Sequence, residues 1–288
     1  MFRERLAQFF RDRVAGPDAE ERAERIWRTP GERWFTDDDP IARVNGAGSM
    51  YVGGIRALLL QSLHPLPMEA VVQFSNYQGD PWTRLQTTAY YVAETTYGRV
   101  ADATALINRV RQVHTHIHGT TPNGRRFDAC DPHQLMWVHV AEIDSFLTAY
   151  QMYSGTPLTP AEEDTYVEQA AVPARLLGVV DPPTTVAEMK TILADYTPEL
   201  KLTPGAAGVV EFMTSKPPVP AYLRPGFAMF VAGAIASLPT QYRAMLQVPT
   251  SGNWWRHPMG KLATTSVTWS LGHAHLEIPT DGKSGAPA

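Results

Sequence analysis

Hydrophobic positions recur along this chain every three or four residues, which is the period of an amphipathic helix. No alternating strand pattern, hairpin signal or internal repeat interrupts them. Together with helix-starting and helix-ending residues, the pattern predicts helices over 1–14, 18–27, 53–64, 68–74, 81–97, 101–118, 132–153, 160–177, 186–195, 205–214, 225–237, 240–246 and 259–272. We therefore predict an all-α fold with a single helical domain, a loop over 29–52 and a disordered tail over 281–288.

Four of these helices have clear start signals. Asp80 and Asp131 each stand before a proline, and a carboxylate can cap free amides where proline suits the first helical position. Thr159 and Thr185 are each followed three residues later by glutamate, which is the spacing of a capping box. These starts are the firmest boundaries that the sequence predicts.

Composition narrows the class of protein. The 288 residues carry a formal net charge of −4, which argues against a general nucleic-acid binder. Cys130 is the only cysteine, so no intrachain disulfide can form. The N-terminus lacks the apolar core of a signal peptide, and no apolar run reaches about 18 residues. We expect a cytoplasmic protein without stable membrane insertion; its oligomeric state is left open.

Candidate chemistry begins on the predicted helix 81–97. Arg84, Thr88 and Tyr91 stand at i, i+4 and i+7, so they share one face. A guanidinium on a partly apolar face requires an anion or another acceptor, because burying it unpaired is costly. That partner could be a bound ligand. The alternative is a structural ion pair with one of three acids: Asp80, Asp102 or Glu142.

His114 lies in an apolar stripe of the predicted helix 101–118, with Ile107 and Val110 behind it. It is either a core histidine or an axial ligand. In the second case its neutral imidazole would offer Nε2 to a haem iron. His118 stands four residues later and would be an alternative ligand. The same pair permits a zinc site, although Thr115 occupies the position where zinc proteases carry their glutamate.

His139 stands midway along the apolar helix 132–153. Glu142 could bond its ring or pair with Arg84, and spacing does not decide between them. His64, before Pro65, is interpreted as a cap for the last carbonyls of its own helix. Nothing in the sequence is typical of a nucleophile elbow, a phosphate loop or a dinucleotide fingerprint.

Four segments, taken together and in this order, resemble one known family. They read IRALLLQSLHP at 55–65, DPWTRL at 80–85, VRQVH at 110–114 and DPHQLMWVH at 131–139. The order and spacing are similar to the family of latex-clearing rubber oxygenases and MpaB-type oxygenases, over roughly residues 50–250. The resemblance implies an all-helical fold with a globin-like core, a b-type haem, and iron that activates O₂ to cleave a carbon–carbon double bond in an isoprenoid chain.

Carried over residue by residue, the resemblance assigns the iron to His114 and places Arg84 and Thr88 beside the haem. Tyr91 would line the distal cavity, with His139 and Glu142 behind it. The lysine that precedes the threonine in rubber oxygenases is Thr87 here, which favours an open sixth iron position. Other departures are Phe74-Ser75 for a His-Ser pair, Phe127 for a tyrosine, and Glu69 as the nearest acid to the expected base.

We therefore predict a haem b (iron) oxygenase that acts on a small apolar substrate with O₂. The expected division is an approach segment 1–52, a haem-binding domain 53–250 and a C-terminal segment 251–288. Two alternatives stay open. One is a haem-binding sensor or carrier without turnover, and the other is a non-haem metal hydrolase that uses His114 and His118.

Overall fold

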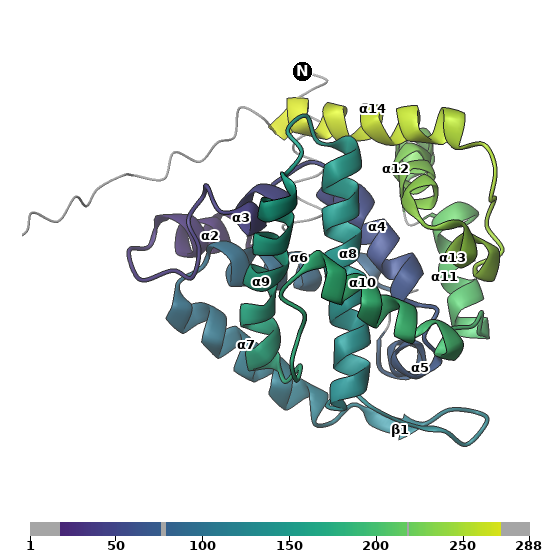
Figure 1. Ribbon diagram of the computed structural model, residues 1–288, viewed down its shortest axis with the longest axis horizontal. Coiled ribbons are helices and arrows are strands. Elements are labelled where there is room, and N and C mark those ends of the chain that lie inside the picture. The colour runs from purple at the N-terminus through teal and green to yellow at the C-terminus, as the bar shows by residue number, and fades with distance from the viewer. Residues whose placement is uncertain (1–17, 76–78, 218, 272–288) are drawn as a thin grey trace, which may run out of the picture.

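A computed structural model describes residues 18–75, 79–217 and 219–271 (Figure 1). The predicted helix 1–14 and the predicted tail 281–288 lie outside the described residues. The division of the chain at 52/53 and 250/251 and the globin-like form of the core stay predictions.

The all-α prediction is confirmed. The helical elements are α2 Ala19–Ala23, η2 Glu24–Arg28, α3 Pro40–Asn45, α4 Met50–Gln61, α5 Pro65–Phe74, α6 Pro81–Tyr97, α7 Val100–His114, α8 Pro132–Tyr153, α9 Pro160–Leu177, α10 Val186–Asp195, η3 Thr197–Glu199, α11 Pro204–Thr214, η4 Ala221–Leu223, α12 Arg224–Ser237, α13 Thr240–Met245 and α14 Asn253–Leu271. Two three-residue strands, β1 His118–Thr120 and β2 Arg126–Asp128, pair antiparallel.

Helix α8 runs through the middle of the molecule and organises the core (Figure 1). It packs against α4 along its length and also contacts α3, α5, α9, α10, α12 and α14. Its side chains Trp137, Val140 and Ala141 are fully buried, and Ile143 nearly so. A helix covered on all sides is expected to be apolar around most of its circumference. Any polar side chain midway along α8 therefore requires a reason.

The four predicted helix starts are confirmed by their hydrogen bonds. Asp80 Oδ1 accepts from the amide of Thr83 at 3.1 Å, and Asp131 Oδ1 accepts from the amide of His133 at 2.9 Å. Both threonine-led starts form complete capping boxes at α9 and α10. Because a cap is local, these boundaries follow from the sequence without knowledge of the fold.

The predicted loop 29–52 is partly wrong, since it contains α3 and the first turn of α4. Pro40 opens α3 at a position where a missing amide costs nothing. Ile41 and Val44 are buried, and the amide of Ile41 donates to Gln169 Oε1 of α9 at 3.0 Å. This six-residue helix is stabilised by contacts with a segment far along the chain, which local periodicity does not reveal.

The predicted helix 101–118 ends four residues early, at His114, and a hairpin follows that the sequence analysis did not expect. Two side chains take the carbonyl of Gln112, which the next helical turn would use: Thr115 Oγ1 at 2.7 Å and His116 Nδ1 at 2.9 Å. The amide of His116 turns to Val113 instead. Side-chain competition for a backbone acceptor thus ends α7.

His64 caps a different helix from the one predicted. Its Nδ1 accepts from the amide of Leu66 at 3.3 Å, so it is the N-cap of α5 and does not bond the last carbonyls of α4. Pro65 stands at the first position of α5, which explains why the chain breaks and restarts here without a loop.

Helices α12 and α14 touch through two glycines, and this contact gives a stability prediction. A Cβ on Gly233 would lie 2.7 Å from the Cα of Gly260. Because backbone would have to move, Gly233→Ala is expected to lower the free energy of unfolding by about 1–3 kcal/mol, measured by chemical denaturation. The matched control is Gly54→Ala on α4, where a Cβ meets nothing within 4 Å, and it is expected to stabilise by about 0.5–1 kcal/mol. Equal effects of the two substitutions would contradict this account of the α12–α14 contact.

Candidate functional site

The predicted site residues before α8 lie on two consecutive helices, α6 and α7. The two helices contact each other and are joined directly at Gly98 and Arg99. Arg84 stands 14 residues before that turn and His114 stands 15 residues after it. At a rise of about 1.5 Å per residue, each is about 21–23 Å from the turn along its own helix.

Arg84 and Thr88 each have a defined hydrogen-bond partner. Arg84 Nη1 donates to Ser75 Oγ at 2.6 Å, at the C-terminal end of α5. Thr88 is exposed and its Oγ1 donates to the carbonyl of Arg84 at 3.1 Å, which leaves the oxygen lone pairs of the hydroxyl to accept. His114 is half-buried, and burial lowers the pKa of its imidazole. Its ring is thus favoured in the neutral form that ligates iron.

A polar strip of α8, formed by His139 and Glu142, lies midway along this largely apolar helix. Among the described residues His139 Nε2 has no hydrogen-bond partner although it is buried, and burial, with a smaller contribution from Arg175, lowers the pKa of its ring to about 4. Burial raises the pKa of Glu142, one turn later, to about 7. The pKa of the Tyr91 hydroxyl, on α6, is raised mainly by burial and to a smaller extent by the nearby Glu142 carboxylate, so Tyr91 stays neutral.

This strip differs from ordinary core in one respect. His139, Glu142 and Tyr91 all retain some accessible surface, although they lie deep enough for burial to dominate their pKa values. A buried imidazole nitrogen without a hydrogen-bond partner requires an explanation, and a bound group that completes it is one such explanation. His139, Glu142 and Tyr91 are therefore candidates to border a bound cofactor.

The predicted relation between His114 and His118 is wrong. His114 is the last residue of α7, and His118 is exposed in β1. Because no helical turn connects them, they do not share a helix face as a zinc-binding pair four residues apart would.

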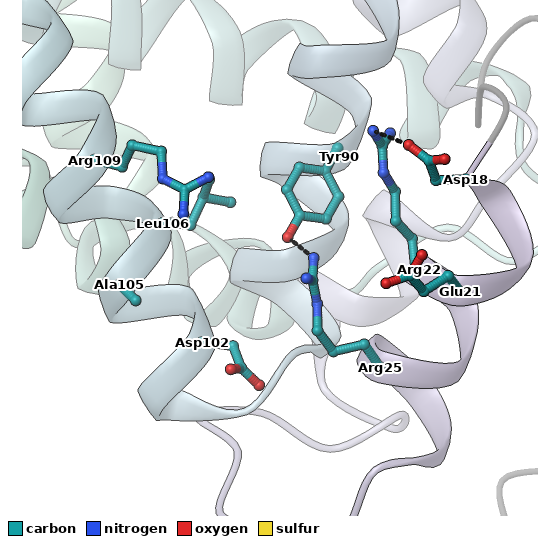
Figure 2. Close-up of a pocket in the computed structure, with 9 residues that line it drawn as sticks. All are labelled: Asp18, Glu21, Arg22, Arg25, Tyr90, Asp102, Ala105, Leu106 and Arg109. Carbon is teal, nitrogen blue, oxygen red and sulfur yellow. Dashed lines mark hydrogen bonds and ion pairs between the residues drawn. The ribbon is translucent and has the colours of Figure 1, made fainter.

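A cavity of about 340 Å³ opens between α2, η2, α6 and α7 (Figure 2). In Figure 2 the hydroxyl of Tyr90 meets the guanidinium of Arg25, which also pairs with Glu94 at 3.3 Å. Its remaining charged lining consists of Asp18, Glu21, Arg22, Asp102 and Arg109. A wall of mixed charges does not suit an apolar substrate. None of the predicted site residues lines this cavity.

One cluster was missed by the sequence analysis. His64, His133 and Glu199 come from three distant segments, and their side-chain nitrogen and oxygen atoms all lie within 4.8 Å of one another. From its position before Pro65, His64 was predicted to have only a capping role, and no pattern indicated a role for His133 or Glu199. No local spacing connects them, so no pattern in the sequence could have found the set.

Comparison with known proteins gives one match. The family described as ER-bound oxygenase mpaB/B′/Rubber oxygenase, catalytic domain, matches residues 42–269, which is most of the chain. Neither the curated proteins nor the solved structures gave a match. Among the described residues, no helix is both long enough and apolar enough to cross a bilayer. The four sequence segments, the helical fold and this match agree, and the chain belongs to the MpaB and rubber oxygenase family, which places it among oxygenases.

Proposed function

We propose that this protein is a haem b-dependent oxygenase that oxygenates or cleaves a small, apolar, isoprenoid-like alkene with O₂. His114 would hold the iron, and the haem would lie against the face shared by α6, α7 and α8. Arg84 and Thr88 would border it from α6, with Tyr91 deeper in the space. His139 and Glu142 would lie behind it on α8.

The observation that carries the proposal is the polar strip of α8. Midway along the central helix, a buried imidazole nitrogen has no hydrogen-bond partner among the described residues, and one turn later burial raises the pKa of an acid to about 7. Leaving such groups without partners costs free energy, so their presence supports a bound group that completes them. Membership of an oxygenase family and the neutral His114 point to haem as that group.

Haem iron, when bound, would supply O₂ activation. The chain's own residues would then do the rest. The guanidinium of Arg84 is placed to pair with an anionic edge such as a propionate, a role for which its planar fork is suited. The lone pairs of the Thr88 hydroxyl can orient a water molecule or a polar edge. Glu142 can hold or release a proton near neutral pH beside the Tyr91 hydroxyl.

Oxygen uptake by the haem-loaded protein tests the proposed reaction. We expect uptake to depend on a short isoprenoid alkene, with oxygenated or carbonyl products that incorporate label from ¹⁸O₂. The saturated hydrocarbon of the same carbon skeleton is the matched control, because it fills the same apolar space and has no double bond. A haem-loaded protein that takes up no oxygen with alkenes of several lengths would contradict the oxygenase proposal and favour the haem-binding sensor or carrier.

A further inference from the structure

A second group of chemistry-bearing side chains lies where α4, α5, α8 and η3 meet. His64 occupies the break between α4 and α5, His133 the first turn of α8, and Glu199 the end of η3. The backbone holds them together, since the amide of Lys201 donates to the carbonyl of Leu63 at 2.9 Å. The cluster therefore depends on the fold itself and does not arise from chance contacts of flexible surface side chains.

The distances match a small coordination sphere. Glu199 Oε2 lies 3.3 Å from His64 Nε2, and Glu199 Oε1 lies 2.8 Å from His133 Nε2. In a tetrahedral zinc site with bonds of about 2.0–2.2 Å, the ligand atoms lie about 3.3–3.6 Å apart. The distance from His64 is already of this size, and the distance from His133 would open by about half an ångström, which the exposed side chain of His133 permits. The two distances end on different oxygens of Glu199, so the carboxylate would either bind the ion through both oxygens or turn to present one of them.

Tyr196 prepares His133 to be a ligand. Its hydroxyl donates to the backbone carbonyl of His133 at 2.6 Å, and its oxygen lies 3.2 Å from Nδ1 of the same residue. His133 Nε2 is hydrogen-bonded to Glu199 Oε1 at 2.8 Å, and a bound cation would take the place of the proton between these two atoms, with Nδ1–H donating to the Tyr196 oxygen. Orientation of a histidine through its other ring nitrogen is typical of metal ligands.

His64 supplies independent support. Its side chain is completely buried, and its Nε2 is aimed at Glu199 without the geometry of a hydrogen bond, although the atoms are only 3.3 Å apart. A fully buried imidazole nitrogen that faces a carboxylate without a hydrogen bond is suited to a cation placed between the two groups.

The geometry points to a divalent metal site, with zinc as the best-fitting ion, formed by His64, His133 and Glu199 and open to solvent at a fourth position. Two imidazoles and one carboxylate are a common zinc ligand set. The half-exposed His133 and Glu199 leave room for water as the remaining ligand. The site uses none of the residues assigned to haem, so it stands independently of the proposed function.

Two features of the surroundings set the cost of binding. Coordination through Nε2 would move the proton of His64 to Nδ1. In the metal-free protein Nδ1 accepts a long hydrogen bond from the amide of Leu66, with 3.3 Å between the two nitrogen atoms. That cap would be lost on metal binding, and two buried donors would then face each other, a cost that the three metal–ligand bonds must exceed. Two charged neighbours act on a bound cation in opposite directions. Arg125 disfavours added positive charge near His64, whereas the carboxylate of Asp131, which lies close to Tyr196, favours it.

Zinc retention by the full-length protein tests the site. After treatment with a chelator, reloading with Zn²⁺ and gel filtration, wild type is expected to keep about one zinc per chain and to melt at a higher temperature than the zinc-free protein. His133→Ala and Glu199→Gln are expected to weaken zinc binding at least about tenfold and to abolish the rise in melting temperature. Both replace accessible side chains, which avoids the folding risk of changing buried His64.

The matched control is His116→Ala, an exposed histidine on another segment, which is expected to keep wild-type zinc binding. Haem content is measured in parallel and should be unchanged in His133→Ala, so failure of the zinc site and failure of the haem proposal give different results. Zinc retention that is absent in wild type, or equal in wild type, His133→Ala and Glu199→Gln, would overturn the assignment and leave a hydrogen-bonded His–Glu–His cluster.

Discussion

Replacement of Arg56 by alanine is expected to lower the free energy of unfolding by about 3–5 kcal/mol. The side chain of Arg56, on α4, is 2% exposed, and its Nη2 lies 2.7 Å from Oδ2 of Asp144 on α8. Its Nη1 donates to Ser145 Oγ at 2.7 Å, and its Nε donates to the carbonyl of Ser237 in α12 at 3.4 Å. Alanine would leave the Asp144 carboxylate without its cation among three packed helices, and most of the cost arises there.

Equilibrium denaturation in urea measures this change, provided that the transition is two-state. The control is Arg28→Ala, which removes an exposed arginine paired with Glu24 on the same helical segment at 2.7 Å. A surface pair of this kind is worth at most about 0.5 kcal/mol. A loss below about 1 kcal/mol for Arg56→Ala would show that the Arg56–Asp144 pair does not hold α4, α8 and α12 together as described.

Substitution of His114 by alanine is expected to reduce the haem bound per chain at least about tenfold. Loss of a residue that only orients a metal ligand typically lowers metal affinity about 10–100-fold, and loss of the ligand itself should lower it at least as much. His114 is the last residue of α7, and burial lowers the pKa of its ring, which favours the neutral form. The measurement is haem content per chain after purification and reconstitution, with the folded state of the variant checked by its helical circular dichroism.

His116→Ala is the matched control for this substitution. His116 lies two residues away, is exposed, and bonds the carbonyl of Gln112 through its Nδ1. It should keep the wild-type haem content. If His114→Ala keeps full haem, the assignment of the iron to His114 is wrong, and His139→Ala becomes the next variant to test because its Nε2 is buried and unpaired.

The parts of the fold that follow from the sequence are those fixed by short-range interactions. The capped helices α6, α8, α9 and α10 have the bounds that their caps and periodicity predict, because each cap joins residues three or four positions apart. The all-α class follows from the same signals. The family resemblance, based on four short segments, agrees with the family match over 42–269.

The parts that the sequence did not reveal depend on distant contacts. Helix α3 is held by Gln169 from α9. Gly119 pairs with Phe127 in the β1–β2 hairpin, where a Cβ would lie 2.8 Å from the phenylalanine ring. Each outcome requires knowledge of which segments meet.

The candidate site shows the same division. The helical period alone groups Arg84, Thr88 and Tyr91 on one face of α6, so that grouping needs no knowledge of the fold. The depth of His139 and Glu142, and therefore their pKa values, depends on what surrounds α8. The cluster of His64, His133 and Glu199 is entirely a product of the tertiary fold.

The most direct test of the proposed haem is an absorption spectrum of the purified protein, oxidised and dithionite-reduced, with a pyridine haemochrome assay for quantity. The account predicts a Soret band and about one haem b per chain. Absence of porphyrin, even after expression with added haem and reconstitution, would contradict it: the chain would then keep the fold of the oxygenase family without this cofactor, and the neutral His114 and unpaired His139 would require another partner.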